Sequence, residues 1–306
     1  MIYEIKFTGA EQDDGSIELE RLALLSHNIL TIAKGALQIR LLGISAERGR
    51  PSENISRALK IKLKKLKKGS TVLELECDTF QNTLIGLQGD FFKNEILNEL
   101  PQMTPMSLVI NSYHEALSEG EKNNLDKALL KSLRDIRKLL IDEEEQIIIS
   151  NKGSTPTLKL KKKDFKKIEL LEEESPAPQQ VIVNGIVELL QYSKSKIIIH
   201  TAEGAVNGYL SDQIIADDVS KYWGKEITVA GTANYKSNGR MSFIEVERLF
   251  APGKEDTYFS RTKKKENAEQ QLQKHLKDFT YTNRLGELVG KWPGDESLDQ
   301  IINSLD

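Results

Sequence analysis

Histidine and cysteine are the residue types that most often perform catalysis or bind metals, and this chain of 306 residues has four histidines and one cysteine. The histidines, at positions 27, 114, 200 and 275, fall in separate segments without the short spacing of a metal site. No Walker loop, Gly-x-Ser-x-Gly elbow or His-Glu-x-x-His pair occurs. We therefore expect no catalysis, no cofactor and no metal. One alternative stays open, a metal-dependent nuclease whose carboxylates are hidden among the 46 acidic residues.

Aromatic and basic side chains that lie near one another between residues 181 and 250 suggest a second kind of chemistry. Small barrels bind single-stranded nucleic acid by stacking bases on aromatic rings while lysine and arginine contact phosphates. The segment holds seven basic residues and eight acidic ones, so it is not basic overall, and a barrel that binds another protein is an equal alternative. The candidate nucleic-acid-binding residues are Tyr192, Lys196, Tyr209, Tyr235, Lys236, Arg240 and Phe243.

The same segment has the pattern of a small β-barrel. Alternating or β-branched runs separated by turn residues predict five strands. The Asn238-Gly239 pair predicts a tight hairpin, because both residues tolerate positive φ. A polar helical stretch is expected near residues 212–221, between the third and fourth strands, as in barrels of the oligonucleotide-binding (OB) type. The predicted strands are Val181–Leu189, Lys196–His200, Ala205–Leu210, Glu226–Ala233 and Met241–Leu249.

The N-terminal half predicts a mixed α/β domain. Ile2–Phe7 alternates like a strand, and a long amphipathic helix is expected from Glu18 onward. Further helices are predicted at 90–100 and after Asn124. Further strands are predicted at 146–150 and 158–160, with a strand or core segment at 103–112 and a continuation of strand at 168–171.

A basic hairpin is predicted in the same half. The arms Ala58–Leu66 and Thr71–Cys77 are separated by a Lys-Gly-Ser turn, after a polar loop at 43–54. The first arm alternates leucine or isoleucine with lysine, so one face should be buried and the other lined with ammonium groups. That line could meet phosphates, but a solvated face that prevents edge-to-edge pairing is the favoured interpretation. Cys77 is expected in the core.

The length of the chain and its linker-like segment indicate the domain organisation. A chain of this length should form two or three domains. The acidic, proline-containing run at 172–178 predicts a linker. We therefore expect an α+β fold: a mixed α/β domain at 1–171, an OB-like barrel at 179–252 and a helical tail at 253–306. With a net charge of −3 and no signal peptide or run of about 18 apolar residues, we expect a cytoplasmic protein with no membrane partner.

The last residues predict a short amphipathic helix. Pro293-Gly294 makes a turn, and Asp295 can cap the helix that follows. At about eleven residues this helix is too short to be stable alone in water, so its apolar face and the nearby tryptophan must dock. The surface that they dock on is either this protein's own body or a groove on a partner protein. The candidate partner-binding residues are Trp292, Leu298, Ile301, Ile302 and Leu305.

The run Gly290–Asp306 resembles the tails of antitoxins that neutralise PIN-domain ribonucleases. The resemblance implies a ribonuclease toxin as partner, with Trp292, Leu298, Ile301 and Ile302 contacting its groove. A second resemblance rests on the opening Ile-Lys-Phe-Thr-Gly-Ala, the long helix, the Lys-Gly-Ser hairpin and the barrel. Together these resemble a family of uncharacterised bacterial proteins found in mobile or defence-associated gene neighbourhoods. The leading hypothesis is thus an antitoxin-like interaction protein, and single-stranded nucleic-acid binding is the alternative.

Overall fold

The structure, a computed structural model, describes ten stretches of the chain. These are residues 1–9, 16–46, 53–67, 71–84, 99–151, 155–192, 195–211, 214, 216–253 and 255–262. By contacts between Cα atoms the chain divides into two units, Met1–Lys265 and Glu266–Asp306. All described residues belong to the first unit.

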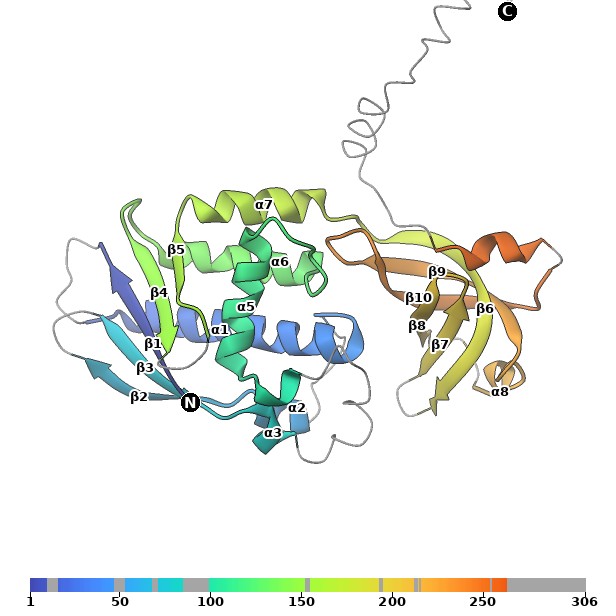
Figure 1. The fold of residues 1–306 in the computed structure, drawn as a ribbon, viewed down its shortest axis with the longest axis horizontal. Coiled ribbons are helices and arrows are strands. Elements are labelled where there is room, and N and C mark those ends of the chain that lie inside the picture. The colour runs from blue at the N-terminus through green and yellow to red at the C-terminus, as the bar shows by residue number, and fades with distance from the viewer. Residues whose placement is uncertain are drawn as a thin grey trace, which may run out of the picture. The chain divides into compact units, whose positions relative to one another are not determined.

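The N-terminal half of the first unit contains a five-stranded antiparallel sheet in the order β2-β3-β1-β4-β5 (Figure 1). β1 lies in the middle, and its residues Tyr3, Ile5 and Phe7 are buried, as alternation along a strand predicts. Cys77 is a buried free thiol, which confirms its predicted place in the core. The strands are β1 (Ile2–Thr8), β2 (Ile61–Lys67), β3 (Val72–Cys77), β4 (Gln146–Asn151) and β5 (Leu158–Lys161).

The helices of this half share one hydrophobic core with the sheet. α1 (Leu19–Leu42) contacts both α5 (Pro105–Leu117) and α6 (Lys127–Asp135), and α7 (Asp164–Glu174) lies beside α6 (Figure 1). α1 ends where Gly43 adopts a left-handed conformation and its N–H donates to the Ile39 carbonyl. The shorter helical turns are α2 (Glu53–Ala58), α3 (Phe80–Thr83), η3 (Leu100–Gln102) and η4 (Ile136–Leu139).

Two segments for which strands were considered are helical. For residues 103–112 the alternative of a core segment is confirmed, since Met106, Leu108, Val109 and Ile110 are buried. Residues 103–112, predicted as a strand or core segment, form most of α5. There Thr104 and Ser107 make reciprocal capping hydrogen bonds, and Pro105 occupies the first helical position. Residues 168–171 lie inside α7 and do not extend β5. In both segments the apolar run was too short to distinguish the period of a helix from that of a strand. In α5 the capping residues at its start favour the helix.

Three predicted boundaries are also wrong. Ala58 ends α2, so the predicted loop 43–54 and strand 58–66 both give residues to that helix. Asp126, not Asn124, caps the next helix, because its carboxylate accepts from Leu129 N. α7 also continues through Glu172, within the predicted linker, where Arg134 pairs with it. The predicted turn at 68–70 and most of the predicted helix 90–100 lie outside the described residues.

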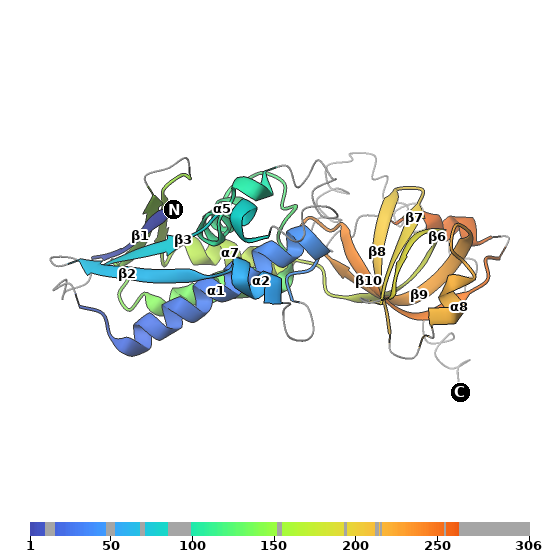
Figure 2. The same cartoon turned by 90° about the horizontal axis from the view of Figure 1, so that it is seen from below.

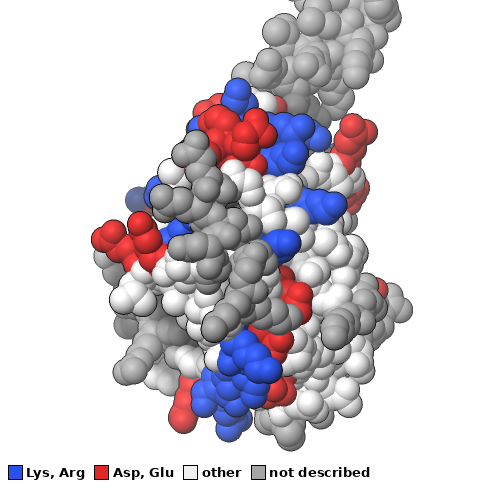
Figure 3. Space-filling view, turned by 90° about the vertical axis from the view of Figure 1, so that its left-hand side faces the viewer, with Lys and Arg blue, Asp and Glu red and all other residues white. Residues whose placement is uncertain are grey.

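The predicted lysine stripe on β2 faces carboxylates. Lys62 and Lys65 lie opposite Glu76 and Glu74 of β3, and Lys64 Nζ is 3.1 Å from Glu76 Oε2. Seen from the side of the sheet, basic and acidic side chains are interleaved in the described part (Figure 3). The apolar face of this strand is only partly covered, since Leu63 is 47% exposed at the sheet edge. This pattern favours the solvated-face interpretation.

The second half of the first unit contains a closed five-stranded mixed barrel in the order β10-β8-β7-β6-β9 (Figure 2). All five predicted strands are confirmed within about two residues at each end, and α8 (Ala216–Ser220) lies in the predicted helical stretch. The Asn-Gly hairpin joins the last two strands, with Gly239 at φ 80°. The strands are β6 (Gln179–Gln191), β7 (Lys196–Thr201), β8 (Gly204–Leu210), β9 (Glu226–Tyr235) and β10 (Met241–Phe250). η6 (Asp256–Ser260) follows them.

Alternation along the barrel strands separates a core from an outer face. Val183, Val187, Ile227 and Val229 point inward and are fully buried. A register shift between Val187 and Leu189 ends the alternation in β6, which leaves Leu189 40% exposed rather than on the inner face.

One helix in the described part is long and apolar enough to cross a membrane. An 18-residue window of α1 has a mean hydropathy of 1.2, although polar residues interrupt its apolar ones. More than half of that window, 56%, is buried inside the protein, and core helices of soluble proteins meet the same criterion. The expected cytoplasmic location without a membrane partner therefore stays a prediction.

Candidate functional site

A cleft of about 520 Å³ lies between α6 and the strands β9 and β10. One wall is basic and comes from α6, and the opposite wall is partly aromatic and comes from the barrel. The rest of the lining comes from two prolines, which follow α7, and from the segment after α1. The described lining residues are Ile44, Ala46, Asp126, Lys127, Ala128, Lys131, Arg134, Glu172, Pro176, Pro178, Asn234, Tyr235, Ser242 and Phe243.

Asp126 fixes the α6 wall at its N-terminus. Its Oδ1 accepts from Leu129 N at 2.8 Å and caps the helix, and its Oδ2 accepts from Ser45 N at 2.9 Å. The Ser45 hydroxyl also donates to this carboxylate. One side chain therefore holds the segment after α1 against the start of α6. A carboxylate at this end is further stabilised by the helix dipole.

The hairpin turn between β9 and β10 is fixed to the residues before α6. Ser237 N donates to the Leu125 carbonyl at 2.9 Å, and Asn238 Nδ2 donates to Asn123 Oδ1 at 2.8 Å. Asp126 and Lys236 form an isolated antiparallel bridge. These contacts join the barrel wall of the cleft to the α6 wall, so the spacing of the walls is set by backbone as well as side chains.

The basic wall consists of Lys127, Lys131 and Arg134, which lie at helix positions i, i+4 and i+7 and therefore share one face of α6. Lys127 and Lys131 are exposed. Arg134 is half-buried, and its Nη1 is 2.7 Å from Glu172 Oε2 on α7. The two lysines can approach an anion in the cleft directly, whereas Arg134 is held by its carboxylate.

The aromatic wall consists of Tyr235 and Phe243. Phe243 packs edge-to-face on Tyr209, with ring centroids 5.6 Å apart and planes at 81°. The Tyr209 hydroxyl donates to the Leu42 carbonyl at the end of α1, at 3.3 Å. This bond directs the tyrosine hydroxyl toward α1, and the contact with Tyr209 supports the Phe243 ring beside the cleft.

Tyr235, one of the four aromatic residues named as candidates for base stacking, is not an exposed ring. This side chain is only 8% exposed, belongs to neither hydrophobic core and lies against the cleft. Burial raises the pKa of its hydroxyl. Burial also lowers the pKa of the neighbouring Lys236, which the carboxylate of Glu115 opposes. The contact of the barrel with the N-terminal half removes both groups from the fully solvated surface that the sequence suggested.

The other predicted residues lie apart from the cleft. Lys196 is the cross-strand partner of Tyr209 on the β7–β8 face, and Tyr192, 85% exposed, follows β6. Arg240 is exposed in the β9–β10 turn. Phe243, Tyr209 and Lys196 thus form a continuous series from the cleft onto the β7–β8 face. Tyr192 and Arg240 do not line the cleft.

Lys127, Lys131 and Arg134 were not identified from the sequence. Their spacing along one face of α6 was visible, but the same spacing describes the solvated face of many helices. Only the contact between this helix and the barrel gives the stripe a partner surface. No sequence signal in either segment indicates that contact.

The tail residues Trp292, Leu298, Ile301, Ile302 and Leu305 lie outside the described residues. Within the stretches that are described, no group of three or more His, Cys, Asp or Glu side chains is arranged to hold a metal ion. Comparisons with protein-family models, with curated proteins and with solved structures found no match.

Proposed function

We propose that this protein binds single-stranded nucleic acid without catalysis, in the cleft between α6 and the barrel. The observation that carries the proposal is the composition of the cleft: Lys127 and Lys131 line the same opening as Tyr235 and Phe243. A single strand offers both phosphates and unstacked bases, and such walls suit it better than a duplex whose bases are covered.

The topology of the barrel supports this proposal. Four of its five strand pairs are antiparallel, β8 and β10 are parallel, and α8 lies between β8 and β9. We assign this arrangement to the OB type, in which the face of the second and third strands and the loops 1–2 and 4–5 bind oligonucleotides. Here the corresponding parts are the β7–β8 face, the turn after Tyr192 and the turn at 236–240. The turn at 236–240 is fixed to the residues before α6, so a nucleic-acid strand bound at this turn is directed through the cleft.

The charge of the whole chain does not oppose the proposal. Binding of a single strand depends on local contacts, because each phosphate that is neutralised releases counterions near the site. The net charge of −3 therefore limits long-range attraction but not the contacts at α6. Stacking of a base on an aromatic side chain contributes about 1–3 kcal/mol and tolerates any sequence. We expect binding that varies little with sequence and strongly with salt.

Replacing both lysines, Lys127→Gln with Lys131→Gln, should weaken binding of a single-stranded oligonucleotide about tenfold at low salt, at about 0.7 kcal/mol for each exposed contact. The slope of log K against log salt concentration should become less negative by about 1.4, since each contact contributes about 0.7. Fluorescence anisotropy with a labelled oligothymidine of defined length measures both quantities.

The matched control is Lys62→Gln with Lys65→Gln, which removes two charges from β2, where both lysines lie opposite carboxylates. This control should leave affinity and salt slope unchanged. Equal losses in the two double variants would mean that total charge, and not the cleft, governs binding. Absence of binding by the native chain at low salt would reject the proposal itself.

The antitoxin-like function is a second proposal, and the apolar spacing of residues 298–305 favours it. Deleting residues 287–306 should abolish co-purification with a protein partner, because an amphipathic segment docks through its apolar face. The double variant Ile301→Asp with Leu305→Asp should have the same effect. Gln300→Ala with Asn303→Ala, on the other face, should retain the partner. Capture of the same partner by the deleted chain would contradict this function, and oligonucleotide binding should survive the deletion.

A further inference from the structure

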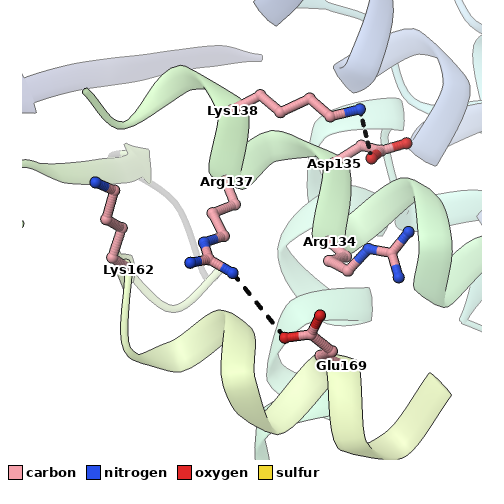
Figure 4. A pocket seen from close by; sticks show the side chains of 6 residues that line it. All are labelled: Arg134, Asp135, Arg137, Lys138, Lys162 and Glu169. Atoms are coloured by element: carbon pink, nitrogen blue, oxygen red, sulfur yellow. Dashed lines mark ion pairs between the residues drawn. The ribbon is translucent and has the colours of Figure 1, made fainter. Parts of the chain in front are cut away.

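A second basic pocket, of about 350 Å³, adjoins the cleft along α6. Figure 4 shows its side chains, which come from α6, η4, the turn after β5 and α7. Arg134 lines this pocket as well as the cleft, so the two openings share a residue. The described lining residues are Arg134, Asp135, Arg137, Lys138, Lys162 and Glu169.

Basic side chains outnumber acidic ones in the two segments that supply most of this pocket's lining. Residues 127–138 contain five basic side chains and one acidic one, and residues 159–167 contain six and one. The segments are far apart in the sequence, but the contact between α6 and α7 brings them together (Figure 1). This contact is one place where the chain gathers positive charge, and residues 60–68, with six lysines, are another.

Each basic side chain of this pocket has a carboxylate partner, at distances between 2.7 and 4.0 Å. Lys138 Nζ is 2.9 Å from Asp135 Oδ1, but Arg137 Nη1 is 4.0 Å from Glu169 Oε2 (Figure 4). Lys162 Nζ is 3.2 Å from Glu143 and also donates to the Ile141 carbonyl at 2.9 Å. The Arg137–Glu169 and Lys138–Asp135 pairs are largely exposed, and exposed ion pairs contribute little to stability, whereas the Lys162 side chain is mostly buried. At Arg137 and Lys138 a phosphate can therefore replace or share the carboxylate partners at small cost, and a guanidinium has five donors to share.

The cations form one row from the cleft to the second pocket. Lys127, Lys131, Arg134 and Lys138 lie at i, i+4, i+7 and i+11, so they follow one stripe along α6 and η4. At about 1.5 Å of rise per residue the row is roughly 16 Å long. This length exceeds what one or two stacked bases cover and fits a strand of several nucleotides.

We infer that a bound single strand leaves the cleft along α6 and continues into the second pocket, where Arg137, Lys138 and Lys162 contact its phosphates. This inference rests on the proposed function and adds a requirement for the length of the bound strand. The second pocket has no described aromatic lining residue, so its contacts are with the backbone and are independent of base identity. Strands long enough to reach it bind through two connected parts, and short strands use the cleft alone.

The test compares oligothymidines of about 5 and about 15 nucleotides, lengths within the range of single barrels. In the native chain the longer strand should bind more tightly, with a salt slope more negative by about 2, because three further cations each contribute about 0.7. The triple variant Arg137→Gln, Lys138→Gln, Lys162→Gln should lose this difference. Its affinity for the short strand should stay within about twofold of the native value.

The outcomes separate this inference from the proposed function. If neither strand binds to the native chain, the function fails. If both bind and the triple variant keeps the full length dependence, the function stands and the second pocket is not part of the site. Equal binding of a 15-base-pair duplex, with the same loss in the variant, would show a general phosphate surface and overturn the single-strand path. The control Lys60→Gln, Lys62→Gln, Lys65→Gln removes three charges at the far edge of the sheet and should change nothing.

Discussion

Gly231→Ala should disrupt the barrel while leaving the N-terminal sheet folded. Gly231 lies in β9, opposite Val246 of β10. A Cβ atom added at this position would lie 1.9 Å from the Glu245 carbonyl oxygen and 2.9 Å from its carbonyl carbon. Backbone atoms cannot rotate away as a side chain can, so β10 must move and the β9–β10 pairing must break. We expect a loss of at least about 3 kcal/mol, the upper part of the range for overpacked sites.

Hydrogen exchange followed by mass spectrometry measures this effect separately in each half of the chain. Protection should fall in β9 and β10 and persist in β1 and β4. Gly120→Ala is the matched control, since the nearest atom to its added Cβ is a serine hydroxyl at 3.9 Å. Unchanged protection of β10 in Gly231→Ala would mean that the two strands do not approach as closely as the structure indicates.

Asp126→Ala should have the next largest effect, because it removes the helix cap of α6 and the acceptor of Ser45 together. Loss of a cap costs about 1 kcal/mol. The backbone N–H of Ser45, on a residue only 8% exposed, would also lose its partner, which costs about 1–3 kcal/mol more. We expect a total of about 2–4 kcal/mol, measured by urea unfolding. Affinity for a single strand should fall as well, since α6 carries the basic wall of the cleft.

Asp126→Asn is the informative control for that prediction. Its side-chain oxygen can cap α6 almost as well as a carboxylate does, so the helix should be retained. The carboxylate accepts from Leu129 N through Oδ1 and from Ser45 N through Oδ2, whereas the amide has only one acceptor atom and cannot accept from both through two oxygens. Stability should therefore be intermediate. A variant as stable as the native chain would show that the bonds to Ser45 contribute nothing.

The barrel was predictable because each of its strands is marked locally. Alternation places Ile227, Val229 and Ala233 on one face, and all three are fully buried. The Asn-Gly pair gives the last hairpin a turn that needs positive φ, which Gly239 supplies. The errors lie in the N-terminal half, where a strand was considered at 103–112, as an alternative to a core segment, and at 168–171. Those runs are short and apolar on several sides, so the core that surrounds them obscures their period.

The candidate site was only partly predictable. Aromatic residues were recognised at Tyr209, Tyr235 and Phe243, but their exposure was not, because burial of Tyr235 depends on a contact with a distant segment. The basic wall was missed for the same reason. Lys127 and Lys131 look like an ordinary solvated helix face until the barrel lies opposite them.

By itself the sequence determined the elements whose signals are local: the five barrel strands, the Asn-Gly hairpin, the first strand and the long helix α1. Steric limits on φ and ψ and the burial of one face act over a few neighbouring residues, so these signals can be read along the chain. The tertiary structure alone decided the pairing of α6 with the barrel, the joining of residues 127–138 with 159–167 and the burial of Tyr235. Such contacts depend on the free energy of packing whole surfaces, which no short stretch of residues contains.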